Sequence, residues 1–91
     1  MKHFTFDEFT RSVTAKKLGI DNQPEHNNEQ YVYANIELLV SKLLDPIREY
    51  VGEPIYINSG YRSQELNEAV GGVPDSQHRK GQAADIRIGN I

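Results

Sequence analysis

The chain has 91 residues, enough for one small domain, and 37% hydrophobic with 25% charged residues is a globular composition. It contains no cysteine, which excludes disulfides, cysteine-based zinc sites and thiol catalysis, so any metal must be held by His, Asp or Glu. The formal net charge is -3 and the basic residues are scattered, which argues against a nucleic-acid partner.

A short helix is predicted to begin directly after Thr5. Thr5 can serve as its N-cap, and Glu8, three residues later, completes a capping box. Phe4 and Phe9 fit the hydrophobic staple that often accompanies such a box. Beyond this point two alternatives are open: the helix continues for a few residues, or a second helical turn runs over residues 14–18.

A long helix is predicted next, starting near Pro24 or Asn28. Its apolar residues recur at spacings of three and four and form one stripe, made of Ile36, Leu39, Val40, Leu43, Leu44 and Ile47. Pro46 lacks the N–H of an interior helix bond, so either the helix kinks there or Asp45 caps a new turn. Because the stripe stays in phase across Pro46, we expect a kinked continuation that ends at Gly52.

The remaining chain is predicted to form two short strands with a helix between them. Residues 54–58 read as a strand, with Ile55 and Ile57 on one face. Ser63 can cap a short helix, and residues 83–88 read as the second strand. Helices followed by strand, helix and strand predict an α+β fold, in which the N-terminal helices pack on a small antiparallel sheet.

His78 and Asp85 are the candidate metal ligands. His78 lies in a loop and Asp85 in a strand, and Gly81 between them permits a tight backbone bend. If the two side chains converge, an imidazole nitrogen and a carboxylate oxygen are donor atoms that suit zinc. Asp85 lies between apolar neighbours, so we expect its carboxylate to need a partner, which is a metal or one of Arg62 and Arg87. Spacing alone also allows a salt-bridged Asp85 and a histidine that is merely a surface loop residue.

The run Ser76-x-His78-x-x-Gly81-x-Ala83-x-Asp85 resembles the signature of the zinc D-Ala-D-Ala carboxypeptidases, a family of peptidoglycan metallopeptidases. In that family the His and the Asp of this run are two of three protein ligands to zinc. The resemblance therefore implies that His78 and Asp85 bind zinc in this chain.

An upstream run at residues 59–63, Ser-Gly-Tyr-Arg-Ser, is similar to a second motif of the same family. The resemblance places Arg62 in the active-site cleft as a catalytic residue that holds a substrate carbonyl or carboxylate. Asn67 and the glycine pair at 71–72 also match, and residues 44–48 resemble the compact phage and bacterial branch. The similarity thus extends over most of the chain.

The family's third zinc ligand is a His on a later strand, usually beside a Trp, and its catalytic carboxylate lies a few residues earlier. This sequence has no Trp and no counterpart of either residue. His3 and His26 are expected to be exposed instead. We therefore expect residues 1–91 to be a single peptidase-like domain lacking its C-terminal part, with weak zinc binding and little activity as this chain.

The resemblance implies a zinc-dependent peptidase for peptidoglycan stem peptides, of carboxypeptidase or endopeptidase type. The alternatives are a non-catalytic module that binds cell-wall peptide or a partner, and a small structural domain. No membrane span or export signal is visible, which predicts a cytoplasmic chain. The resemblance implies a bacterial or phage origin and a substrate in the cell wall or periplasm. Missing final strands would leave an exposed sheet edge, so self-association is expected.

Overall fold

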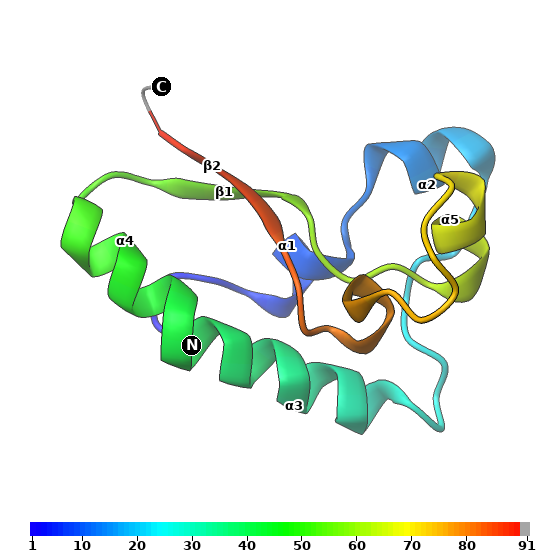
Figure 1. Ribbon diagram of the computed structural model, residues 1–91, viewed down its shortest axis with the longest axis horizontal. Helices are drawn as coiled ribbons and strands as arrows, with labels where there is room; N and C mark the ends of the chain where they lie inside the picture. The colour runs from blue at the N-terminus through cyan, green and yellow to red at the C-terminus, as the bar shows by residue number, and fades with distance from the viewer. Residues whose placement is uncertain (90–91) are drawn as a thin grey trace.

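The computed structural model describes residues 1–89 and shows helices followed by a two-stranded antiparallel sheet (Figure 1). The helical part comprises α1 (Phe6–Thr10), α2 (Val13–Leu18), α3 (Glu29–Leu39), the π-helical η1 (Val40–Leu44) and α4 (Asp45–Val51). The second part comprises β1 (Ile55–Ser59), α5 (Gln64–Ala69), the 3₁₀-helical η2 (Gln77–Lys80) and β2 (Asp85–Ile88). The predicted α+β class is confirmed. Within residues 1–89 no helix has both the length and the apolar character to cross a membrane.

The first helix begins where its capping signals place it. The carboxylate of Glu8 accepts a hydrogen bond from the backbone N–H of Thr5 at 3.1 Å. The rings of Phe4 and Phe9 are both buried and meet edge to face, with centroids 6.3 Å apart, as expected for a hydrophobic staple. Of the two alternatives for the next residues, the second is confirmed, because α2 is a separate helix capped by Ser12.

One long helical body forms from α3, η1 and α4 (Figure 1). At the end of η1 the N–H of Asp45 donates to the carbonyl of Val40, five residues earlier, which is the wide π-helical bond. Pro46 follows in the first turn of α4, where its missing N–H is tolerated. The predicted continuation through Pro46 is confirmed, and Gly52 ends the helix at φ +69°.

The buried face of this helix forms the centre of the core. Buried positions recur every four residues, at Val32, Ile36, Val40 and Leu44, and the wide π turn keeps this spacing on one face. Leu43, which we expected in the stripe, is 49% exposed, so that part of the prediction is wrong. The π turn changes the helical phase and turns this side chain away from the sheet.

The sheet carries an irregularity at the end nearest the candidate site. Ile57 lies opposite Ile86, whereas Ser59 lies opposite Asp85, so Asn58 is an additional residue in β1. Such a β-bulge bends the strand locally and changes the direction of the side chains that follow. The first residue of β2 therefore faces a distorted end of β1.

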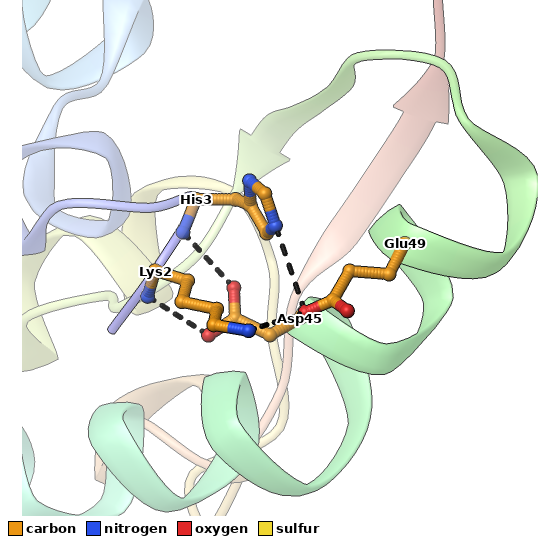
Figure 2. A network of polar contacts seen from close by, with 4 residues as sticks. All are labelled: Lys2, His3, Asp45 and Glu49. Atoms are coloured by element: carbon orange, nitrogen blue, oxygen red, sulfur yellow. Dashed lines mark hydrogen bonds and ion pairs between the residues drawn. The ribbon is translucent and has the colours of Figure 1, made fainter.

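Asp45 fastens the N-terminal segment to α4 (Figure 2). Its two carboxylate oxygens accept the backbone N–H groups of Lys2, at 2.9 Å, and of His3, at 3.1 Å. One turn later, Glu49 pairs with the Lys2 ammonium at 3.1 Å and lies 3.8 Å from Nε2 of His3. The carboxylate of Asp45 is buried, but each of its oxygens accepts a hydrogen bond. The segment that it anchors leads directly into Phe4, which packs in the core.

Gly81 approaches α3 so closely that a larger residue should destabilise the fold. Its φ is +77°, and a Cβ there would lie 2.7 Å from the carbonyl oxygen of Val32. Gly71 has nearly the same φ, +75°, but open space around it. We expect Gly81→Ala to lower the free energy of unfolding by about 2–5 kcal/mol, and Gly71→Ala by only about 1–2 kcal/mol. Urea denaturation measures both, and equal losses would contradict a packing role for Gly81.

Candidate metal centre

His78 is held in place by contacts on its backbone and on its ring. It lies in η2, where the hydroxyl of Ser76 accepts its N–H at 3.2 Å. Its carbonyl accepts the N–H of Arg62 at 3.0 Å, and its ring Nδ1 lies 2.7 Å from the carbonyl oxygen of Gly60. With a side chain only 14% exposed, the imidazole is a fixed part of the fold and not a surface loop residue.

The contact with Gly60 determines which ring nitrogen of His78 is available. A carbonyl oxygen can only accept, so Nδ1 must carry the proton when the ring is neutral. Nε2 is then an acceptor, and it lies 3.7 Å from Oδ2 of Asp85. Two acceptors at this separation attract each other only through a positive charge, either a proton on the ring or a metal ion.

The separation of this pair is close to what a shared zinc ion requires. Zinc binds imidazole nitrogen at about 2.0–2.1 Å and carboxylate oxygen at about 2.0–2.2 Å, which places two donors about 3.3–3.5 Å apart at the tetrahedral angle. Nε2 of His78 and Oδ2 of Asp85 are 3.7 Å apart, so a small side-chain movement brings both within reach of one ion. Among residues 1–89 no group of three or more His, Cys, Asp or Glu side chains could hold a metal ion, so this pair offers two ligands.

Asp85 is more exposed than the sequence indicated. We expected a carboxylate buried between apolar neighbours, but its side chain is 65% exposed. Asp85 is the first residue of β2, and strand alternation turns Ile86 towards the core and the carboxylate away from it. Its arginine neighbour is Arg62, at 3.9 Å, whereas Arg87 lies over the ring of Tyr56.

Arg62 is positioned by Asn67. Its Nη1 donates to Oδ1 of Asn67 at 3.2 Å, while its Nη2 lies 3.9 Å from Oδ2 of Asp85. Asn67 is 1% exposed and also donates to the carbonyl of Val73 at 2.7 Å, so it holds the loop that leads to His78. A Cβ on Gly72 would collide with the same amide oxygen, which explains the glycine there.

Asn22 supports the site and was missed by the sequence analysis. Its Nδ2 donates to the carbonyls of Thr10 and Tyr61, both at 2.9 Å, and its Oδ1 accepts the N–H of Ser63 at 2.7 Å. These contacts fix the backbone on both sides of Arg62. Burial raises the pKa of the Tyr61 phenol, so this ring is a neutral packing group at physiological pH. In the sequence Asn22 looks like any loop asparagine, because its partners are distant along the chain.

The site thus combines a close His–Asp pair with a fixed arginine on an α+β scaffold. The family described as Peptidase M15 matches residues 2–91, so the chain belongs to the M15 peptidase family. The family resemblance that rested on the motif at residues 76–85 is confirmed.

A curated relative is the zinc D-Ala-D-Ala carboxypeptidase of Streptomyces albus G, which is 42% identical over 48 residues. That alignment covers 52% of this chain and 19% of the relative, so the chain spans a small part of the relative's length. No solved structure matches the chain.

The Gly60 contact gives a prediction for the tautomer of His78. When its ring is neutral, we expect His78 to carry its proton on Nδ1 alone, because the carbonyl of Gly60 can only accept. His26, whose side chain is 99% exposed, is an internal control and should show a mixture of tautomers. Two-bond ¹⁵N–¹H correlation spectra distinguish the two states, and a proton on Nε2 of His78 would remove the basis for a metal ligand at this position.

Proposed function

We propose that this chain forms the His–Asp part of a zinc peptidase site for peptidoglycan stem peptides, of D-Ala-D-Ala carboxypeptidase or endopeptidase type. The observation that supports this most directly is the approach of Nε2 of His78 to Oδ2 of Asp85, at 3.7 Å, with Arg62 at 3.9 Å from the same oxygen. Family membership and the name of the zinc carboxypeptidase relative support the reaction class.

In this proposal His78 and Asp85 are the zinc ligands. The carbonyl of Gly60 keeps the proton on Nδ1 of His78, which leaves Nε2 free and fixes the ring orientation. When bound, zinc supplies a Lewis acid that polarises a peptide carbonyl and activates water for its hydrolysis. The exposed carboxylate of Asp85 leaves this side of the pair open to substrate.

Arg62 is the proposed catalytic cation. Its guanidinium has five N–H donors, and the contacts with Asn67 and Asp85 leave several of them free. A planar guanidinium binds a terminal carboxylate in two contacts, or offsets negative charge that develops on a carbonyl oxygen. Because Nη2 of Arg62 and Oδ2 of Asp85 are 3.9 Å apart, their ion pair is loose. The guanidinium therefore remains available for either role and is not committed to a structural ion pair.

Two protein ligands should hold zinc weakly. A catalytic zinc site normally has three, so we expect loose binding and little hydrolysis by the 91-residue chain. The same shortage of donors favours a second candidate function, a module that binds cell-wall peptide without cleaving it. The two candidate functions differ in their dependence on zinc: a peptidase requires zinc for turnover, whereas a peptide-binding module binds peptide without turnover and without zinc.

Zinc titration tests the proposed ligands. We expect one zinc per chain, and His78→Ala should weaken its binding by at least about tenfold because half of the protein ligands are lost. His26→Ala is the matched control and should change nothing, since that side chain is 99% exposed. Calorimetry measures the affinity. Zinc-dependent hydrolysis of a D-Ala-D-Ala peptide that His78→Ala abolishes would contradict the expected inactivity, and equal zinc affinity in both variants would contradict the ligand assignment.

We also propose that β2 pairs with β2 of a second copy. Within residues 1–89 the sheet has two strands, so β2 has β1 as its partner on one side. Antiparallel pairing centred on Ile86 places Asp85 opposite Arg87 of the second copy, twice by symmetry. This register is self-complementary in charge, whereas neighbouring registers place like charges together.

A charge swap on β2 tests this pairing without zinc. We expect light scattering to show dimers, and Arg87→Asp to dissociate them because two carboxylates then face each other. The double variant Asp85→Arg/Arg87→Asp restores the opposite charges and should restore the dimer. A protein that is monomeric at all concentrations, or a double variant that stays monomeric, would contradict the pairing.

A further inference from the structure

A second hollow, of about 570 Å³, lies where the loop over residues 21–28 passes α5 and η2 (Figure 1). Its volume is in the range of pockets that hold small ligands. His78, Asp85 and Arg62 do not line it, so it is separate from the candidate metal centre.

A buried phenol without a hydrogen-bond partner forms the floor of this hollow. Tyr61 is 6% exposed, and within residues 1–89 its hydroxyl makes no hydrogen bond. In the same part of the chain no fully buried side-chain oxygen or nitrogen lacks a partner, so the phenol oxygen is not sealed in the core. It opens into the hollow that its ring lines, where Arg79 and Glu25 both act on its pKa. A polar atom on a buried ring normally has a partner, and here the position is left for a ligand atom.

The rim of the hollow carries three carboxylates from two segments of the chain. Asp21 and Glu25 come from the loop, and Glu65 from the first turn of α5. Within residues 1–89, the side chains of Glu25 and Glu65 make no hydrogen bond or ion pair. Asp21 uses Oδ1 for the N–H of Gln23, at 3.1 Å, and keeps Oδ2 free. The rim therefore has unused acceptors and negative charge.

The positive groups of the rim do not neutralise these carboxylates. Nη1 of Arg79 donates to the carbonyl of Pro74 at 2.7 Å. Nδ1 of His26 lies 4.0 Å from Glu29, which is not part of the hollow. In the described part of the chain neither group forms an ion pair with a rim carboxylate. Three carboxylates thus outnumber one guanidinium, and the hollow attracts a cation.

The spacing of the donors favours an organic cation over a metal ion. Across residues 1–89 no three His, Cys, Asp or Glu side chains are close enough to hold a metal, so the rim carboxylates do not converge on one point. An ammonium group has three N–H donors that point in different directions. A neutral phenol oxygen below it and separate carboxylates around it match that arrangement. Pro24, which is buried beside Tyr61, offers an apolar surface to an aliphatic chain.

Asn22 holds the two walls of the hollow together before any ligand binds. It lies in the loop, yet its Nδ2 donates to the carbonyl of Tyr61 at 2.9 Å and its Oδ1 accepts the N–H of Ser63 at 2.7 Å. The loop is therefore fixed against the segment that leads into α5. A preformed hollow lowers the entropic cost of binding a small ligand.

We propose that this hollow binds an alkylammonium group, with its N–H donors on the phenol oxygen of Tyr61 and the rim carboxylates, and its methylenes against Pro24. The group belongs either to a lysine side chain of a peptide or to a free amine. Asn27 and Asn28 line the same hollow, and within residues 1–89 their side chains make no hydrogen bond, so they are available to peptide groups. This proposal does not rest on zinc binding or on peptidase activity.

NMR titration of the zinc-free chain at neutral pH tests the site. The probes are Nα-acetyl-lysine methylamide, its Nε-acetylated form, and butylammonium chloride. We expect the lysine derivative to shift the ring signals of Tyr61 and the backbone amide signals of Glu25 and Glu65. Acetylation removes the charge and should weaken binding by at least about tenfold. Butylammonium that binds as tightly as the lysine derivative assigns the site to free amines, whereas weaker butylammonium binding assigns it to a peptide side chain.

Two tyrosine variants separate the phenol oxygen from the fold. Tyr61→Phe keeps the ring in the core and removes a hydroxyl that has no partner, so the chain should stay folded. We expect it to weaken ammonium binding by about tenfold, because a hydrogen bond to a charged group is lost. Tyr33→Phe is the matched control, since the Tyr33 ring packs on Phe6 and does not line the hollow.

The rim charges are tested by isosteric glutamines. Glu25→Gln and Glu65→Gln should each weaken binding by about two- to fivefold, as expected for exposed ion pairs. Glu68→Gln, on the same helix as Glu65 but outside the hollow, should change binding little. The proposal is overturned if the Nε-acetylated probe binds as well as the charged one. It is also overturned if Tyr61→Phe binds as tightly as the unmodified chain, or if Glu68→Gln weakens binding as much as Glu65→Gln does.

Discussion

The hydrogen bond between Nδ1 of His78 and the carbonyl of Gly60 is the interaction on which the candidate site depends. The backbone at Gly60 is itself fixed, because a Cβ there would lie 2.8 Å from backbone atoms of Phe9. The next residue, Tyr61, donates its N–H to the carbonyl of Phe9 at 2.7 Å. Since Phe9 is 1% exposed in the core, the orientation of the imidazole is linked to core packing as well as to the loop around it.

The site is rigid on one side and open on the other. His78 and Arg62 are both mostly buried and joined through their backbones, and Asn67 fixes the guanidinium as well as the adjoining loop. Asp85, in contrast, is 65% exposed at the start of a strand. Preorganised donors beside an accessible carboxylate lower the entropic cost of placing a further ligand, because only that ligand must be ordered.

The sequence predicted local features well and long-range ones poorly. The helix starts after Thr5 and Ser63 were found because capping depends on residues three positions apart. The exposure of Leu43, the η2 turn and the support from Asn22 were not found. Each depends on contacts that the order of residues does not show: a π turn that changes helical phase, a loop held by Asn67, and an amide whose partners lie up to 41 positions away. The candidate pair His78 and Asp85 was singled out by motif resemblance, since spacing alone also allowed a salt-bridged Asp85 and a surface histidine.

The long contact between Arg62 and Asp85 indicates how the two charges divide their roles. Strong guanidinium–carboxylate hydrogen bonds measure about 2.7–2.9 Å, whereas these atoms are 3.9 Å apart, so neither group saturates the other. Oδ2 of Asp85 also faces Nε2 of His78, and its single negative charge is shared between them. When a cation at His78 offsets that charge, the carboxylate attracts Arg62 less, and the guanidinium gains affinity for an anionic ligand beside it. Cation binding and carboxylate binding should therefore be mutually reinforcing across Asp85.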